Sequence, residues 1–179
     1  MHCHVKTWGA IHQKLVKSIS VNSALYVLYN VLGKRRGEVN AMEKLIITAC
    51  ICGAEVTKEH NPAVPYTVEE IAKEAKSAYD AGASIIHLHV REDDGTPTQS
   101  KERFEACINA IKEVCPDVII QPSTGGAVGM SNEERLAPTT LRPEMATLDC
   151  GTCNFGGDEI FVNTENMIID FANTMNEYG

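Results

Sequence analysis

The sequence has no long apolar run and no excess of basic residues. None of its hydrophobic segments approaches the roughly 20 consecutive residues that a membrane-spanning helix needs. Lysine and arginine number 16 against 24 aspartate and glutamate residues, which gives a formal net charge of −8. Nucleic-acid binding depends on clustered basic side chains that neutralise phosphates. We therefore expect neither a membrane protein nor a nucleic-acid-binding protein.

The cysteines do not form the pattern of a disulfide framework. They number seven, which is odd, and several lie in apolar, strand-like segments. We expect reduced thiols in the core of a cytoplasmic protein. Cys150 and Cys153 have the spacing of a zinc knuckle or a redox motif, but a structural zinc site normally needs a second such pair. We therefore favour a structural interpretation of this pair.

Charge divides the chain near Met42. Residues 1–41 hold six basic side chains against Glu38 alone, a net of +5, so the remainder must carry −13 to reach the total of −8. A moderately apolar run follows the first basic residues, but polar residues interrupt it and no signal-peptide cleavage site follows. We predict a poorly ordered extension over residues 1–41 and a separate domain over residues 42–179. An amphipathic helix over about residues 11–32 is the alternative for the extension.

Beyond Met42, short apolar runs alternate with amphipathic helical patterns. The predicted strands are residues 45–51, 83–90, 118–121 and 145–148, and the predicted helices are residues 67–81, 101–114, 133–136 and 164–177. Such alternation gives a parallel sheet with right-handed crossovers. Four βα units are half of a (β/α)₈ barrel, which typically needs about 250 residues. We predict an α/β fold: an incomplete half of a parallel (β/α) barrel of the TIM type.

An open, flavodoxin-like sheet is the alternative architecture, because it can also be built from short βα units. However, no glycine-rich phosphate-binding fingerprint follows the first predicted strand at residues 45–51. This absence weakens a dinucleotide-binding interpretation.

His87 and His89 occupy alternate positions near the end of the second predicted strand. Alternate side chains of a strand share a face, so both imidazoles should point the same way. In a barrel this polar face lines the interior near the carboxyl ends of the strands, where active sites lie. Residues two apart lie about 6.6 Å from each other along a strand, and two imidazoles at that spacing can bind one metal ion. Hydrogen-bonded core histidines are the alternative.

Further polar or small residues follow the other predicted strands. Glu55 comes after the first strand, Ser123, Gly125 and Gly126 come after the third, and Thr147 ends the fourth. A carboxylate at the barrel mouth could bind polar groups of a substrate or transfer protons. The glycines allow close approach of an anion, and Ser123 offers a hydroxyl. The alternatives are a solvated loop charge and an ordinary glycine turn.

Long segments of the chain resemble the β-keto acid cleavage enzymes. They include residues 46–49, 53–55, 61–67, 81–91, 94–98, 121–126 and 142–149, in collinear order. The resemblance runs from about Met42 to Gly179 and does not include residues 1–41. It implies a zinc-dependent (β/α)₈ barrel, usually oligomeric, from a family named after an enzyme of lysine fermentation. The implied reaction combines a β-keto acid with acetyl-CoA as co-substrate and gives acetoacetate and a new acyl-CoA.

The resemblance also assigns roles to individual residues. His87 and His89 match the family's two histidine zinc ligands, and Glu55, Ser123 and Thr147 match positions that contact the keto acid. The family's third zinc ligand, a glutamate, and its catalytic aspartate and arginine come from later strands that this chain does not contain. Catalytic zinc normally has three protein ligands.

Our leading hypothesis is therefore an enzyme fragment, with a homo-oligomer or a complementary C-terminal half as its partner. One alternative is a different metal-dependent barrel enzyme, such as a hydrolase. The other is a non-catalytic truncated product that dimerises to cover its open sheet edges.

Overall fold

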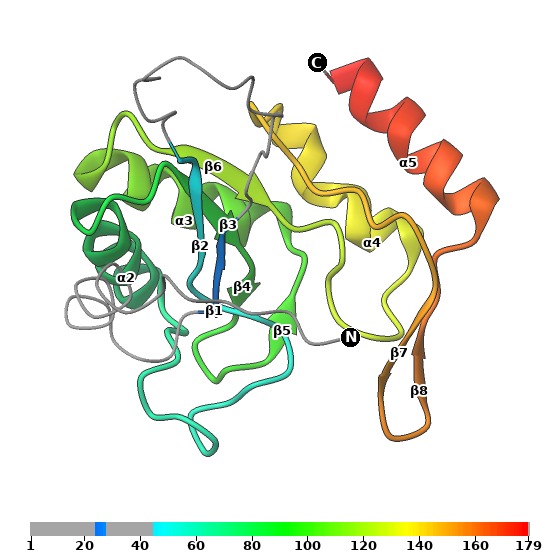
Figure 1. Ribbon diagram of the computed structural model, residues 1–179, viewed down its shortest axis with the longest axis horizontal. Helices are drawn as coiled ribbons and strands as arrows, with labels where there is room; N and C mark the ends of the chain where they lie inside the picture. The colour runs from blue at the N-terminus through cyan, green and yellow to red at the C-terminus, as the bar shows by residue number, and fades with distance from the viewer. Residues whose placement is uncertain (1–23, 28–44, 179) are drawn as a thin grey trace, which may run out of the picture.

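The computed structural model describes residues 24–27 and 45–178 (Figure 1). In the N-terminal segment, Ala24–Val27 forms strand β1, which pairs antiparallel with strand β2 (Ile47–Cys50). These four residues are therefore a strand and not part of the alternative helix. The rest of the predicted extension lies outside the described residues, so its order and its separation from the domain stay predictions.

Three parallel strands form the centre of the main sheet. They are β2, β3 (Ile85–Leu88) and β6 (Ile119–Pro122), and the sheet order is β1-β2-β3-β6. Helix α2 (Val68–Asp80) connects β2 to β3, and helix α3 (Lys101–Val114) lies between β3 and β6 in the chain (Figure 1). The predicted alternation of strands and helices, and the parallel sheet, are confirmed for this part of the chain.

The two crossover helices begin where the sequence predicts. Glu70 N donates to Thr67 Oγ1 and Thr67 N donates to Glu70 Oε2, each at 3.2 Å, which is the reciprocal capping box expected at the start of α2. Ser100 caps α3 through a single bond, because its side chain accepts from Arg103 N. Such caps satisfy amide groups that a helix cannot pair internally, and each contributes about 1 kcal/mol.

The hydrophobic core lies between the sheet and helices α2 and α3. Ile86, Leu88 and Val90 from the second predicted strand are almost fully buried. They pack against the inner faces of the two helices: Ile71, Ala75 and Ala78 of α2, and Phe104, Cys107 and Ile111 of α3. Because side chains alternate along a strand, this packing turns His87 and His89 to the opposite face of the sheet.

The predicted second strand is divided into two pieces. Val90–Arg91 forms strand β4, which leaves the main sheet and pairs antiparallel with β5 (Pro97–Thr98). The turn between them contains Gly95, whose φ is +92°. The predicted strand was therefore too long, because Val90 and Arg91 take part in a local hairpin instead.

The predicted fourth strand at residues 145–148 was wrong. This segment forms no strand, and one backbone hydrogen bond, from Thr147 N to Pro122 O at 3.3 Å, joins it to β6. Hydrogen bonds that involve side chains take the place of the backbone hydrogen bonds of a strand. Thr124 N donates to Thr147 Oγ1, and Thr124 Oγ1 donates to Thr147 O. Hydrophobic patterning identifies the segment as extended but cannot reveal that its hydrogen bonds go to side chains.

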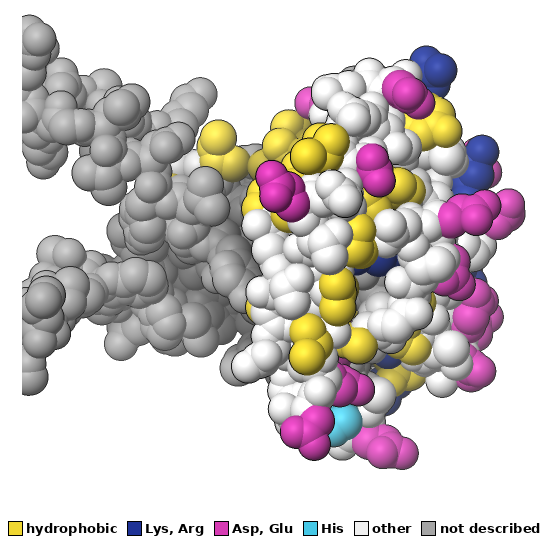
Figure 2. Space-filling model, turned by 90° about the vertical axis from the view of Figure 1, so that its right-hand side faces the viewer, with side chains coloured by type: hydrophobic (Ala, Val, Ile, Leu, Met, Phe, Trp, Pro, Cys, Tyr) yellow, Lys and Arg dark blue, Asp and Glu magenta, His cyan; other side chains and the backbone are white. Residues whose placement is uncertain are grey.

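The C-terminal part of the described chain contains a hairpin that was not predicted. Short helix α4 (Asn132–Leu136) and the 3₁₀ helix η1 (Ala137–Leu141) come first. Strands β7 (Cys153–Gly156) and β8 (Glu159–Phe161) then form a projecting hairpin, and helix α5 (Glu165–Tyr178) follows (Figure 1). On this side of the molecule, hydrophobic side chains lie among acidic ones (Figure 2).

Cysteine burial agrees only partly with expectation. All six described cysteines are free thiols, and Cys52, Cys107 and Cys115 are buried as predicted. Cys150 and Cys153 are exposed, so they are not core residues. Within residues 24–27 and 45–178, no helix combines the length and the apolar character that crossing a bilayer requires.

The buried ring of Phe104 provides a test of this core. Its side chain is 0% exposed, so replacing it by alanine removes buried contacts and leaves a cavity. We expect Phe104→Ala to lower the free energy of unfolding by about 3–5 kcal/mol in urea denaturation. Val114→Ala is the matched control, because Val114 lies on the same helix and is 42% exposed. Similar losses in both variants would contradict the core assignment.

Candidate functional site

The imidazoles of His87 and His89 lie side by side on the face of the sheet opposite the core. Their ring centroids are 5.1 Å apart, and the ring planes are inclined by 71°. With metal–nitrogen bonds of 2.0–2.1 Å and tetrahedral angles, two imidazoles on one zinc ion would have centres about 5 Å apart. The pair therefore fits two ligand positions of such an ion. The same spacing also suits an edge-to-face ring contact, so the ligand role stays a prediction.

Both rings are held in the neutral form. Removal from solvent is the largest cause for each, and it lowers the pKa of His89 to about 3, with the charges of His87 and Arg91 acting in the same direction. The pKa of His87 is also lowered by burial, against the opposing effects of Gln121 and Asp149. Neutral imidazole is the form that binds metal ions.

Gln121 orients the ring of His87. The two residues are direct partners across the parallel strands β3 and β6, and His87 Nδ1 lies 3.1 Å from Gln121 Oε1. With the amide oxygen as acceptor, the proton is on Nδ1 and the Nε2 lone pair is free for a cation. Metal-binding histidines commonly use such a second partner. Our sequence interpretation missed this role, although the register of the two strands could have indicated it.

A third metal ligand is not found in the part of the chain that the structure describes. No group of three or more histidine, cysteine, aspartate or glutamate side chains there is arranged to hold a metal ion. Glu55 is exposed in the loop after β2, and no hydrogen bond or ion pair joins it to His87 or His89 within the described residues. Within the described residues, the two histidines therefore have no third candidate metal ligand beside them.

The loop after β6 is shaped by close packing. Ser123 is buried, and its Oγ atom accepts from Gly125 N at 3.1 Å. A Cβ atom at Gly125 would lie 3.2 Å from Ser123 Oγ. At Gly126, where φ is +65°, a Cβ atom would lie 2.7 Å from Met130 Sδ. Both positions thus favour glycine because the protein's own side chains pack against them, and the predicted approach of an anion to these glycines stays a prediction.

Thr147 closes this loop from the other side. Its Oγ1 atom accepts from Thr124 N at 3.0 Å. Ser123 and Thr147 therefore share one arrangement, in which each hydroxyl oxygen accepts from a loop amide. The hydroxyl protons remain available to another acceptor.

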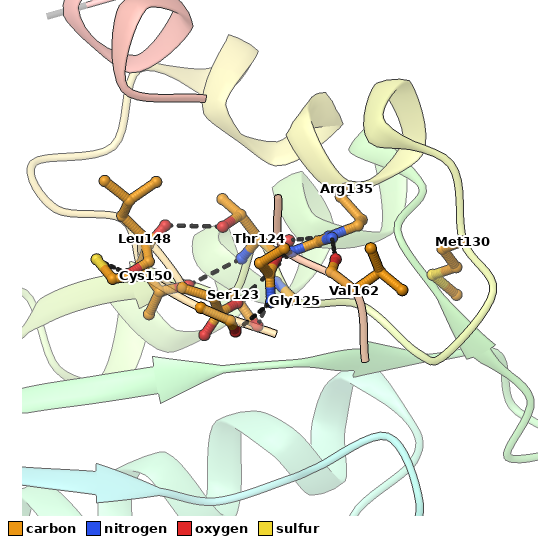
Figure 3. Close-up of polar contacts among 12 residues, drawn as sticks. Ser123, Thr124, Gly125, Met130, Arg135, Leu148, Cys150 and Val162 are labelled. Carbon is orange, nitrogen blue, oxygen red and sulfur yellow. Dashed lines mark hydrogen bonds and ion pairs between the residues drawn. The ribbon is translucent and has the colours of Figure 1, made fainter. Parts of the chain in front are cut away.

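Arg135 supports the loop, and our sequence interpretation did not find it. Its Nε atom donates to Thr124 O at 2.8 Å, and Nη1 donates to Val162 O (Figure 3). The guanidinium lies 4.7 Å from the Phe161 ring centroid and 4.8 Å from that of Phe171. These rings come from the hairpin and from α5, so a cation–π cluster joins the C-terminal elements to the loop.

Residues 44–179 match the family model of the beta-keto acid cleavage enzymes. The chain belongs to this family. The match includes every candidate site residue and excludes strand β1, which lies N-terminal to it. It confirms the resemblance that the collinear motifs indicated.

Individual relatives agree with this assignment. The chain is 82% identical over 138 residues to the 3-keto-5-aminohexanoate cleavage enzyme of Acetoanaerobium sticklandii, covering 77% of this chain and 50% of the relative. It is 39% identical over 134 residues to the 3-oxoadipate:acetyl-CoA acetyltransferase of Cupriavidus necator, covering 75% of this chain and 46% of that relative. The chain thus spans about half the length of the curated relatives it matches.

A solved structure shares the fold. It is titled as a ternary complex of ObcA with a C4-CoA adduct and oxalate, and it aligns with a TM-score of 0.59 and 20% identity. The alignment covers 65% of this chain and 30% of the other. The likeness supports the arrangement of parallel strands and covering helices.

The lowered pKa of His89 predicts how the metal-free chain responds to acid. The unfolded state binds a proton near the ordinary pKa of about 6.5, whereas the folded state binds one only near about 3. Between these values the unfolded chain binds more protons, so stability falls as the pH falls. The contribution of His89 to this loss between pH 7 and pH 5 is about 2 kcal/mol.

We therefore expect the free energy of unfolding, measured in urea, to fall less between pH 7 and pH 5 in His89→Gln than in the parent chain. The difference should be about 2 kcal/mol. His60→Gln is the control, because His60 is exposed. An unchanged acid response in His89→Gln would show that the ring is not held neutral.

Proposed function

We propose that this chain forms the first half of a (β/α)₈ barrel that transfers an acyl group between a β-keto acid and acetyl-CoA. The observation that carries the proposal is the pair of adjacent, neutral imidazoles of His87 and His89 on the polar face of a parallel sheet. The relatives' names support the type of reaction, since they describe β-keto acid cleavage and acetyl-CoA transfer. A role in lysine fermentation in the cytoplasm is part of the proposal.

His87 and His89 would hold zinc, with Gln121 fixing the tautomer of His87. Zinc acts as a Lewis acid that polarises carbonyl oxygens and stabilises developing negative charge. A third protein ligand would come from outside the described residues, because catalytic zinc normally has three. A homo-oligomer or a complementary C-terminal half would supply the remaining barrel strands.

Ser123 and Thr147 would bind the keto acid. Each hydroxyl oxygen already accepts from a loop amide, so each proton can be donated to an anionic oxygen of the substrate. Gly125 and Gly126 would shape the loop that carries these hydroxyls, because Ser123 Oγ and Met130 Sδ lie close to where their Cβ atoms would be. Glu55, exposed in the loop after β2, would bind a polar group of the substrate or accept a proton from it.

Two alternative functions stand beside this proposal. A metal-dependent hydrolase could also use paired histidines, but the family match and the relatives' names favour acyl transfer. The other alternative is a non-catalytic product. Activity measured with and without an added C-terminal half distinguishes these alternatives.

The test is reconstitution. We expect the chain, mixed with the C-terminal half of the Acetoanaerobium sticklandii relative, to exchange acyl groups between acetyl-CoA and a β-keto acid. We also expect it to retain zinc through dialysis. His87→Ala and His89→Ala should each weaken zinc binding by about 100-fold or more, since each removes a ligand. His60→Ala, an exposed histidine away from the pair, is the control.

Zinc content measured by atomic absorption and acetoacetate release would be recorded for each variant. Undiminished zinc binding in both histidine variants would contradict the proposed ligands. Hydrolysis of the substrate without any need for acetyl-CoA would favour the hydrolase.

A further inference from the structure

Arg91 is a fully buried cation at the end of strand β4, with 0% exposure. Its guanidinium donates to three backbone carbonyl oxygens. Nε and Nη2 donate to Gly53 O at 3.0 and 2.6 Å, Nη2 also donates to Val56 O at 2.9 Å, and Nη1 donates to Gly95 O at 2.7 Å. Arg91 thus joins the loop after β2 to the β4–β5 hairpin.

No carboxylate forms an ion pair with Arg91 among the described residues. Buried arginines are normally paired with an acid, because removing a charge from water is costly. Here the carbonyl dipoles and the ring of Tyr66, whose centroid is 5.3 Å from Cζ, stabilise the charge. The same ring packs against Gly95, where a Cβ atom would lie 2.3 Å from Tyr66 Cε2. The environment is therefore built to hold the guanidinium in one position.

Two of the three carbonyl groups flank Glu55. Gly53 lies two residues before it and Val56 directly after it. No described backbone hydrogen bond between main-chain groups involves residues 53–56. The other described donor to Gly53 O is the thiol of Cys52, a weak donor at 3.4 Å. Arg91 is therefore the main hydrogen-bonding anchor of this loop.

The anchor also belongs to the strand segment that carries the histidines. Arg91 lies two residues beyond His89, which is the one residue between β3 and β4. A loop fixed to Arg91 is thereby fixed relative to the imidazole pair. Small displacements of a reacting group reduce catalysis strongly, so such a fixed distance has a chemical use.

We propose that Arg91 is a positioning residue that holds the Glu55 carboxylate at the mouth of the histidine site by binding the carbonyl groups on both sides of it. This inference rests on the proposed function for the role of Glu55. The anchoring of the loop itself does not depend on that function.

Arg103 provides a matched comparison. It too donates to backbone carbonyls, with Nε 2.7 Å from Arg91 O and Nη2 3.2 Å from Tyr66 O. Neither carbonyl flanks Glu55. A lysine at either position keeps the charge but cannot reproduce the fork of donors.

The first experiment tests the anchor in the chain as it is. A glutamate-specific endoprotease cleaves after Glu55 only when the loop can open. We expect Arg91→Lys to increase the rate of cleavage at the Glu55–Val56 bond by about tenfold, and Arg103→Lys to leave this rate unchanged. The cleavage products are measured over time by mass spectrometry. Cleavage after the exposed Glu59 serves as an internal reference. Equal rates in Arg91→Lys and the parent chain would overturn the anchor.

The second experiment tests the consequence in the reconstituted enzyme by a double-mutant cycle. We expect Arg91→Lys to lower kcat/KM by about tenfold or more when Glu55 is present, and by less than about twofold in a Glu55→Gln background. The same loss in both backgrounds would mean that Arg91 acts structurally and not through Glu55, and would overturn the proposal. Absence of acyl exchange in the unmodified reconstituted enzyme would count against the proposed function, whereas the protease result would still decide the anchor.

Discussion

The burial of alternate residues of one strand determines on which face of the sheet the candidate site lies. Ile86, Leu88 and Val90 contribute their side chains to the core beneath α2 and α3. Strand geometry then requires His87 and His89 to face the opposite side. A shift of one residue in register would exchange the two sets and place both imidazoles among the helices. The candidate site is thus specified by the hydrophobic core before any polar contact is considered.

The polar contacts refine this arrangement in two groups. Gln121, the partner of His87 on the neighbouring strand, orients the His87 ring on the face of the sheet opposite the core. The loop after β6 is held by hydroxyls and by the buried guanidinium of Arg135. Buried arginines thus act on two loops at the carboxyl ends of the strands, and in each case they bind backbone carbonyls. Rigid support of this kind is what a binding site on loops requires.

The sequence predicted the structure best where helix capping and the pattern of apolar residues indicate the same element. The capping box of α2 and the apolar periodicity of α2 and α3 predicted these helices almost to the residue, because their stabilising contacts are close in sequence. The segment at residues 145–148 was misassigned, because its hydrogen bonds go to Thr124 across more than 20 residues of chain. The contacts of Arg135 with Phe161 and Phe171 were missed for the same reason: the two rings come from the unpredicted hairpin and from α5, both distant from Arg135 in the sequence. Gln121 lay within a quoted motif, yet its role depends on strand register.

The tip of the β4–β5 hairpin has a consequence for how this gene can change over time. Gly95 has a left-handed backbone, faces the ring of Tyr66 directly, and gives its carbonyl to Arg91. Gly82 has a similar φ, but nothing lies within 4 Å of where its Cβ would be. A side chain at position 82 would therefore strain only the backbone, whereas a side chain at position 95 would also displace an aromatic ring. Natural variants of this chain should accordingly change less often at position 95 than at position 82.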